Sequence, residues 1–470
     1  MARGFAHVML GVHEEHGGAG VSRRIGLGVE LSAVVRLALP VVAVQLGLML
    51  MGVVDAMMLG RVSAQALAAG ALGDSLSFSL LVGAMGILMA IDPLVSQAHG
   101  AEDREAIAAH LERGLVLALA LAVPLSLLLW NARTFLSRLG EPAALVLGGT
   151  AFIRGSVPGV VPFLLFVVLR QTLQAMGIVR PAVVAMLVGN LVNFVGDYVL
   201  IFGHFGAPAL GVAGSAYATS IGRWIMLMVL AFSSRKVLAP YFRGFTRQAF
   251  AWRAHGHHLQ LGVPIGVHNS LELSVFAAVA LLMGRLGVHE LAGHQIALNL
   301  AAISYMVPAG VSAAASTRVG NAIGREDMPG ARRAAVVCLL LGAGVMSLSG
   351  LLFALAPRFL AGLYSPDPGV LAMGAALIPV AAAFQVFDGV QVVGAGVLRG
   401  AADTRFAAIV ALVGYWVLGL PLGAVFAFRF GHGPRGLWWG LTLGLAIVAV
   451  LLLARIVRRF RGHIARVGGV

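Results

Sequence analysis

Residues 40–61, PVVAVQLGLMLMGVVDAMMLGR, form a run that is long enough to cross a bilayer as a helix and is apolar almost throughout. The run nevertheless contains one carboxylate, Asp55, which at about 1.5 Å per helical residue lies roughly 9 Å below Arg61. A charge at that depth costs about 2.5–3.5 kcal/mol on insertion scales, so Asp55 is expected to face protein or a wet cavity. Asp55 is therefore the first candidate functional residue. The alternative is a structural carboxylate held by backbone donors or by an arginine.

The composition of the whole chain agrees with this interpretation. Of 470 residues, 59% are hydrophobic and 11% are charged, and the mean hydropathy is +0.93. Soluble domains average about 25% charged residues, so the chain is predicted to be an all-α integral membrane protein. The net charge of +14 resides in loops, as membrane topology requires, and no nucleic-acid partner is expected. The single Cys338 excludes an internal disulfide.

Twelve apolar segments are predicted to span the membrane. They lie near residues 34–59, 68–95, 114–131, 145–168, 181–202, 210–232, 260–284, 290–316, 334–356, 370–397, 406–428 and 436–457. An even number of spans places both termini on one side, and the loops on that side hold most of the arginines. This bias predicts cytoplasmic termini in a multi-pass protein of the inner, or plasma, membrane.

The expected domains follow from these spans. They are a polar leader at 1–30, a first lobe at 31–232, a basic linker at 233–259, a second lobe at 260–457 and a basic tail at 458–470. The HEEH motif at residues 13–16 resembles a metal-binding tract, but we interpret it as part of a solvated tail without assigned chemistry.

The two lobes repeat. A shift of 224 residues aligns Pro40 with Pro264 and the sequence GAED at 100–103 with GRED at 324–327. Each half holds six spans, so the lobes are predicted to be parallel, pseudo-symmetric repeats about an axis along the membrane normal. Such repeats build transporters that bind substrate between their lobes. A channel would need a filter sequence or several subunits, and neither is visible.

More polar residues lie inside the first lobe, in GNLVNFVGDYVLIFG at 189–203. This segment contributes Asn190, Asn193 and Asp197. Asn193 and Asp197 are four residues apart and share a helical face. Asp197 lies about 10 Å from the outer end of its span, close to the depth of Asp55. We therefore expect the two carboxylates to share one site in the outer half of the membrane.

The second lobe carries its own carboxylates, Glu272 and Asp388. Each lies about 17–18 Å from the inner end of its span, which is near the midplane. His268 is one turn from Glu272 on the same face and is a candidate proton relay. A structural hydrogen-bond partner is the alternative role for this histidine.

Several segments resemble the multidrug and toxic compound extrusion (MATE) family, and they cover roughly residues 34–425 in family order. They are MGVVDAMMLGR, PLVSQAHGAED, RQTLQAMGIVRPAVV, GNLVNFVGDYVLIFG, APALGVAGSAYATS, LAGHQIALN, VPAGVSAAASTRVGNAIG, FQVFDGVQVVGAGVLRGAADTR and GYWVLGLPLG. The resemblance implies export of organic, usually cationic or amphipathic, compounds against a gradient of H⁺ or Na⁺. No other cofactor is implied.

Site residues also follow from the resemblance. Asp55 matches the first-helix acid of the family's cation site, Asn193 and Asp197 match its fifth-helix pair, and Thr219 matches a sixth-helix ligand. Glu272 and Asp388 match the second-lobe acids of bacterial norfloxacin exporters. Asp197 stands where that subgroup often has Asn, and Phe384 stands where some members have Tyr. The chain thus carries features of two branches, which leaves the coupling ion open between H⁺ and Na⁺.

The predicted function is antiport by alternating access, in a protein that could work as a monomer. No metal site is expected beyond Na⁺ at Asp55, Asn193 and Asp197. Side chains expected to line an adaptable substrate cavity, with core packing as the alternative, are Met58, Phe163, Phe276, Phe384 and Gln391. A flippase for lipid-linked sugars is the rival class, but a basic cavity would suit its pyrophosphate better than these acids. No HExxH motif or nucleophile–base pair suggests an enzyme.

Overall fold

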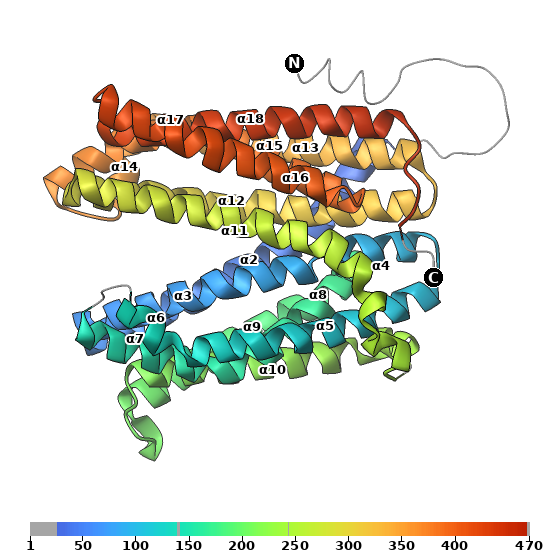
Figure 1. Ribbon diagram of the computed structural model, residues 1–470, viewed down its shortest axis with the longest axis horizontal. Helices are drawn as coiled ribbons and strands as arrows, with labels where there is room; N and C mark the ends of the chain where they lie inside the picture. Colours follow the sequence, from blue (N-terminus) through green and yellow to red (C-terminus); the bar gives the residue numbers. More distant parts are fainter. Residues whose placement is uncertain (1–25, 139–141, 243, 468–470) are drawn as a thin grey trace. The chain divides into compact units, whose positions relative to one another are not determined.

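The structure is a computed structural model that describes residues 26–138, 142–242 and 244–467. The first 25 residues of the expected leader, with its HEEH motif, lie outside the described residues, as do the last three of the basic tail. The described part of the chain is helical and contains no strand (Figure 1).

Twelve helical segments of this part are long and apolar enough to cross a membrane, and each overlaps one predicted span. The first six are formed by α2 (Leu27–Val62), α3 and α4 (Ala64–Leu88, Ile91–Gly100), α5 (Arg104–Trp130), α7, η1 and α8 (Ala143–Ser156, Val157–Gly159, Val160–Ala175), α9 (Arg180–Phe202), and α10 with η3 (Val212–Leu238, Ala239–Tyr241). The last six are formed by η5 and α11 (Trp252–His255, Gly256–Leu286), α12 (Val288–Gly324), α13 (Met328–Leu355), α15 (Pro368–Gly400), α16, η6, α17 and η7 (Thr404–Ala411, Leu412–Gly419, Leu420–Ala424, Val425–Arg429), and α18 (Gly433–Arg461). Short helices α6 (Ala132–Arg138), η2 (His204–Gly206), η4 (Arg247–Phe250) and α14 (Pro357–Gly362) lie in the connections.

Several helices run past the predicted ends of their spans. α2 begins at Leu27, so the last residues of the expected leader are helical, and α10 extends into the expected linker as far as Leu238. Hydropathy shows where the apolar layer ends, whereas a helix continues until a cap or a turn satisfies its last backbone groups. This difference explains why the helices are longer than the apolar runs.

The chain divides into two compact units. Unit 1 holds the chain up to Val42, the segment Ser96–Glu102 and the chain from Val267 onward, and unit 2 holds Ala43–Val95 and Asp103–Gly266. The expected lobe boundaries differ from these units because α2, α4 and α11 each contribute residues to both. The units therefore do not follow the sequence halves throughout.

The turn that each GxED motif forms has the same backbone geometry in both halves of the sequence. Glu102 and Glu326 have left-handed backbone angles, with φ of 57° and 59°. Asp103 Oδ1 accepts a 2.9 Å hydrogen bond from the Ala106 amide, and Asp327 Oδ1 accepts a 2.8 Å bond from the Gly330 amide. Each aspartate thus caps the helix that follows it. The repeat seen in sequence is therefore a repeat of structure.

Unit 1 is organised around α15, which packs against α12, α13 and α18 (Figure 1). Close approach of α15 to α12 depends on Gly396 and Gly400. A Cβ on Gly396 would collide with Ser312, and one on Gly400 would meet the Ser316 carbonyl oxygen at 2.6 Å. Small residues allow backbones to approach in membrane bundles, where lipid offers no hydrophobic driving force between helices.

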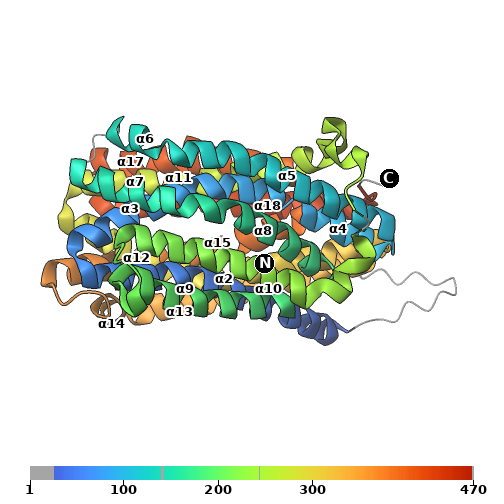
Figure 2. The same ribbon diagram turned by 90° about the horizontal axis from the view of Figure 1, so that it is seen from below.

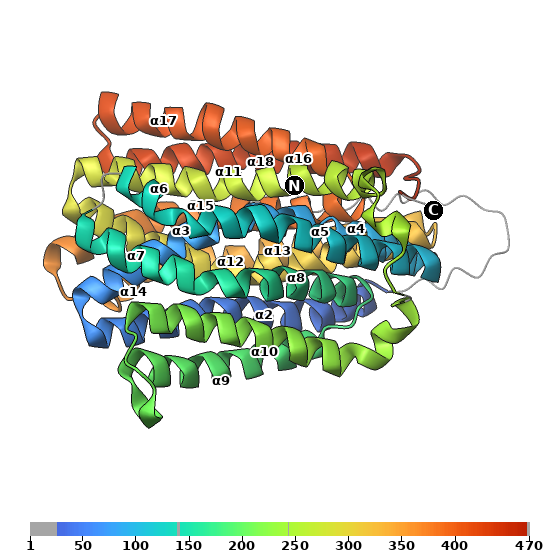
Figure 3. The same ribbon diagram turned by 60° about the horizontal axis from the view of Figure 1, so that its bottom comes forward.

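Unit 2 contains two groups of packed helices. Figure 2 shows α3, α5 and α7 running alongside one another. Figure 3 shows α9 beside α10. The part of α2 in this unit carries Asp55, so the candidate residues of the first half all lie within unit 2.

Candidate functional site

Three helices of unit 2 bring Asp55, Asn193 and Thr219 into direct contact. Asn193 Nδ2 on α9 donates a 3.1 Å hydrogen bond to Asp55 Oδ1 on α2. Thr219 Oγ1 on α10 donates a 2.9 Å bond to Asp55 Oδ2. Asn193 Nδ2 also lies 3.2 Å from Thr219 Oγ1. Both carboxylate oxygens of Asp55 are therefore held by side chains from other helices.

Asp197 completes this cluster. It is fully buried, and its side chain interacts with those of Asp55 and Ser215. Neither of its carboxylate oxygens accepts a hydrogen bond of good geometry. Two adjacent carboxylates in a low-dielectric site repel strongly unless one carries a proton or a cation lies between them. The cluster can thus exchange a proton or a cation.

Small residues set the positions of these side chains. Gly222 on α10 faces Asn193 on α9, and a Cβ there would lie 3.5 Å from the Asn193 Cβ and 3.3 Å from the Gly189 carbonyl oxygen. Gly196 would place a Cβ 3.0 Å from that of Ala218. Because α9 and α10 approach this closely, a short threonine reaches the asparagine and the aspartate.

Asn190, predicted as part of the site, is directed elsewhere. Its Nδ2 donates a 3.0 Å hydrogen bond to the Met186 carbonyl oxygen and lies 3.0 Å from the Met186 sulfur. An asparagine in a helix readily bonds to the carbonyl four residues before it. The expected grouping of Asn190 with Asp55 is therefore not seen in its hydrogen bonds.

Arg223 on α10 is a charged neighbour of the site. Its guanidinium lies over the Phe163 ring, 4.7 Å from the centroid, and interacts electrostatically with Asp74 and Asp55. Phe163 is buried and packs against this cation, in addition to its expected role at a cavity. The signal in the sequence was a lone arginine within an apolar span, which needs a countercharge.

A second polar cluster lies in unit 1, around His268. The ring Nδ1 lies 3.2 Å from the Ala407 carbonyl oxygen, and Nε2 lies 3.2 Å from Gln391 Nε2 and 3.8 Å from Glu272 Oε2. A carbonyl oxygen can only accept, so Nδ1 carries the ring proton and Nε2 of the neutral ring accepts from Gln391. His268 is thus held as a hydrogen-bond partner while it faces the carboxylate proposed for proton exchange.

Asp388 and two tyrosines extend this cluster. Asp388 is buried and interacts electrostatically with Glu272. Tyr305 and Tyr415 lie near both carboxylates, within the range of electrostatic interaction. Sequence reasoning missed both tyrosines, because a tyrosine in an apolar span resembles an ordinary core residue.

Other side chains predicted for a substrate cavity are packed in cores. Met58 packs with Leu59 and Ile201 in unit 2. In unit 1 the rings of Phe276 and Phe384 have centroids 6.1 Å apart, and Trp438 lies 5.8 Å from Phe384. This packing accounts for these three side chains without a substrate. No group of three or more His, Cys, Asp or Glu in the described ranges is arranged to hold a metal ion.

The fold and these clusters define a class: a multi-pass helical membrane transporter with carboxylates buried inside its spans. The MatE family model matches residues 40–199 and again 264–425, the same 224-residue spacing as the repeat. The chain belongs to the MatE family.

Its relatives are named multidrug resistance proteins. The chain is 36% identical over 443 residues to the probable multidrug resistance protein NorM of Mesorhizobium japonicum, covering 92% of this chain and 94% of the relative. It is 38% identical over 453 residues to the multidrug resistance protein PmpM of Pseudomonas aeruginosa, covering 94% of each. Among solved structures, the eukaryotic MATE transporter AtDTX14 shares the fold with a TM-score of 0.83 at 24% identity, covering 93% of this chain and 99% of that one. The all-helical, two-repeat fold predicted from the sequence is confirmed.

Proposed function

We propose that the protein exports organic, cationic or amphipathic compounds in exchange for H⁺ or Na⁺. The single observation that carries this proposal is the Asp55 cluster. Asp55 is held by Asn193 and Thr219, and it interacts with the buried carboxylate of Asp197. Such a pair suits an exchange reaction, because loading a cation relieves the repulsion and releasing it restores the repulsion.

The chemistry of the cluster fits either coupling ion. A proton would bind to one carboxylate and be shared with the other. Na⁺ prefers hard oxygen ligands, and Asp55, Asp197, Asn193 and Thr219 offer carboxylate, amide and hydroxyl oxygens. Asn193 Oδ1 is buried and accepts no hydrogen bond, so it is free to serve as a ligand.

The Glu272–Asp388 cluster of unit 1 has a related role in this proposal. The buried carboxylate of Asp388 and the partly buried carboxylate of Glu272 provide countercharge for a cationic substrate or a second coupling site, and His268 relays the proton or orients Glu272. Alternating access, in which the lobes expose the sites to each side in turn, couples the ion to the substrate. The arginine-rich loops support an orientation with both termini in the cytoplasm, and in this proposal the protein operates as a monomer in the cell membrane.

A flux assay tests the proposal. The protein is reconstituted in proteoliposomes loaded with a cationic dye, and either a pH gradient or a Na⁺ gradient is imposed. We expect dye flux driven by one of these gradients and abolished in Asp55→Asn. Flux of a lipid-linked sugar without ion dependence would overturn the proposal in favour of a flippase.

A further inference from the structure

The connection between α10 and α11 is a folded segment with two different faces. It contains η3, η4 and η5 and packs against α5 within unit 2. Across residues 233–260 the sequence carries five basic residues and no acidic residue. Arg243, one of the five, lies outside the described residues.

One face of the segment is fixed to the protein. Thr246 Oγ1 donates a 3.2 Å hydrogen bond to Glu112 Oε2 on α5. His255 and Ala249 are buried, and the His255 Nε2 lies 2.9 Å from the Ala249 carbonyl oxygen. The rings of buried His258 on α11 and His110 on α5 lie 5.2 Å apart beneath this face. The segment is thus held in one orientation by polar and ring contacts.

The opposite face carries aromatic side chains that the protein leaves exposed. Phe242, Phe245, Phe250 and Trp252 are exposed by 50%, 48%, 64% and 72%. The ring centroids of Phe242 and Phe245 are 5.8 Å apart, and those of Phe245 and Phe250 are 6.0 Å apart. The three phenyl rings therefore form one continuous apolar surface.

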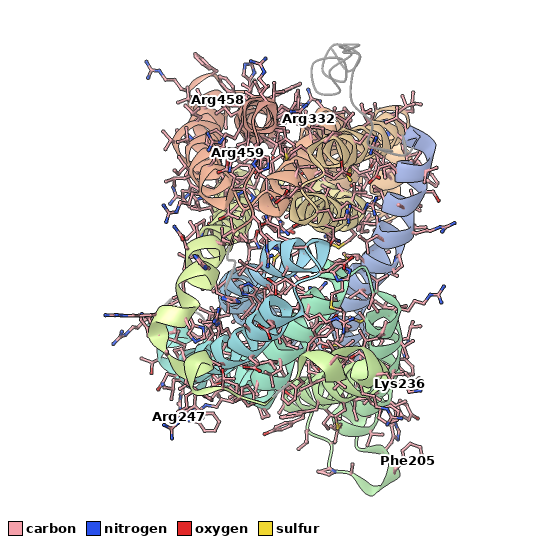
Figure 4. The ribbon with its side chains drawn as sticks, turned by 90° about the vertical axis from the view of Figure 1, so that its right-hand side faces the viewer. Phe205, Lys236, Arg247, Arg332, Arg458 and Arg459 are labelled. Carbon is pink, nitrogen blue, oxygen red and sulfur yellow. The ribbon has the colours of Figure 1, made fainter. Side chains whose placement is uncertain are left out.

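Exposed basic side chains lie along the same stretch of the chain. Lys236, Arg247 and Arg253 are exposed. Figure 4 shows Arg247 pointing outward from the rim of unit 2. Trp and Phe with Lys and Arg on an interfacial segment are typical of elements that lie in the headgroup region of a bilayer. Because α10 and α11 both cross the membrane, the segment between them must lie close to a membrane surface.

We propose that residues 239–242 and 244–255, with Lys236, form an interfacial anchor that binds anionic phospholipid headgroups through Lys236, Arg247 and Arg253 while the four aromatic rings enter the same leaflet. The occupant is an anionic lipid because the segment carries only positive charge and joins two candidate membrane spans. The proposal is independent of the coupling ion and of the exported substrate.

Fluorescence quenching in proteoliposomes tests this proposal. Vesicles contain phosphatidylcholine with a minor fraction of phosphatidylglycerol, and one of the two lipids carries bromine on its acyl chains. The contribution of Trp252 is obtained by subtracting the signal of Trp252→Phe. We expect brominated phosphatidylglycerol to quench Trp252 several-fold more than brominated phosphatidylcholine at the same mole fraction.

Neutralising the basic residues separates the headgroup contacts from insertion. In a Lys236→Gln, Arg247→Gln, Arg253→Gln variant, the preference for phosphatidylglycerol should disappear, since each basic residue near an anionic surface contributes about fivefold in binding. The matched control removes the same charge from loops on the other side: Arg133→Gln, Arg138→Gln, Arg429→Gln. The control should keep the preference.

Three outcomes would overturn the proposal. Equal quenching by the two brominated lipids in the unmodified protein would show that no anionic headgroup is selected. Absence of any Trp252 quenching would show that the segment does not enter the leaflet. Loss of the preference on adding soluble glycerol 3-phosphate would assign the basic residues to a soluble anion rather than to lipid.

Discussion

Thr219 Oγ1 on α10 donates a 2.9 Å hydrogen bond to Asp55 Oδ2 on α2. The bond joins two helices through residues that are 164 positions apart in the sequence. A hydroxyl that donates to one carboxylate oxygen while Asn193 donates to the other fixes the orientation of the aspartate. The carboxylate is thereby presented to Asp197.

Asp55→Asn should abolish gradient-driven export and leave substrate binding measurable. The amide keeps the shape of the side chain but cannot take up and release a proton or balance a cation. Dye efflux and equilibrium dye binding are measured on the same preparation. Full efflux by Asp55→Asn would remove this residue from the coupling reaction.

Asp197→Asn should retain export and shift its pH dependence. Removing the neighbouring negative charge makes protonation of Asp55 harder, so in a proton-coupled exporter the efflux–pH profile moves to lower pH. Efflux rates across a pH series in this variant and in the unmodified protein provide the test. Superimposable profiles would show that the two carboxylates are uncoupled.

Thr219→Val should destabilise the protein by about 1–3 kcal/mol, because it leaves a buried Asp55 oxygen without its donor. Thr219→Ser keeps the hydroxyl and serves as the matched control, so its thermal unfolding in detergent should resemble that of the unmodified protein. Equal unfolding temperatures for the Val and Ser variants would contradict the role given to this hydrogen bond.

Glu272→Gln and Asp388→Asn should each impair export of cationic dyes without preventing folding. Each change replaces a carboxylate that is costly to desolvate, buried at Asp388 and partly buried at Glu272, with a neutral side chain of similar shape. Membrane yield and dye efflux are compared with those of Glu326→Gln, which alters an exposed loop residue. Export at the unmodified rate by both variants would show that the second cluster is not needed.

Glu30→Gln should lower the free energy of unfolding by about 2–3 kcal/mol, because the change leaves the Arg318 guanidinium without the charged partner that it binds. Arg318 binds the Glu30 carboxylate through two hydrogen bonds, of 2.9 and 2.8 Å, and the Glu30 side chain is only 4% exposed. A double-mutant cycle with Arg318→Met isolates the pair. A cycle with no coupling energy would show that the pair contributes nothing to stability.

Gln97→Ala should loosen the segment Ser96–Glu102 within unit 1. Gln97 Nε2 donates a 2.9 Å hydrogen bond to the Gly400 carbonyl oxygen, and its Oε1 accepts a 2.9 Å bond from the Val467 amide. Hydrogen exchange of amides 96–102 should be faster in this variant and unchanged in Gln295→Ala, an exposed control. Unchanged exchange in Gln97→Ala would show that other contacts hold the segment.

The sequence by itself determined the membrane class, the twelve spans and the repeat. Hydropathy shows which segments of the chain lie in the apolar layer of the membrane. Because an α-helix rises by a fixed distance per residue, the number of residues between a side chain and the end of its span gives the depth of that side chain. For this reason the similar depths of Asp55 and Asp197 could be predicted, and the repeat of the GxED motif at 100–103 and 324–327 could be seen in the sequence.

Only the tertiary structure decided which side chains meet. Contacts between α2, α9 and α10 depend on how closely small residues let these helices approach, and depth does not contain that information. The structure therefore directs Asn190 to its own helix and brings Arg223 to Asp74 and Asp55. It also adds Tyr305 to the second cluster and packs Phe384 into a core, because the direction of a side chain around a helix is fixed by its neighbours and not by its position along the chain.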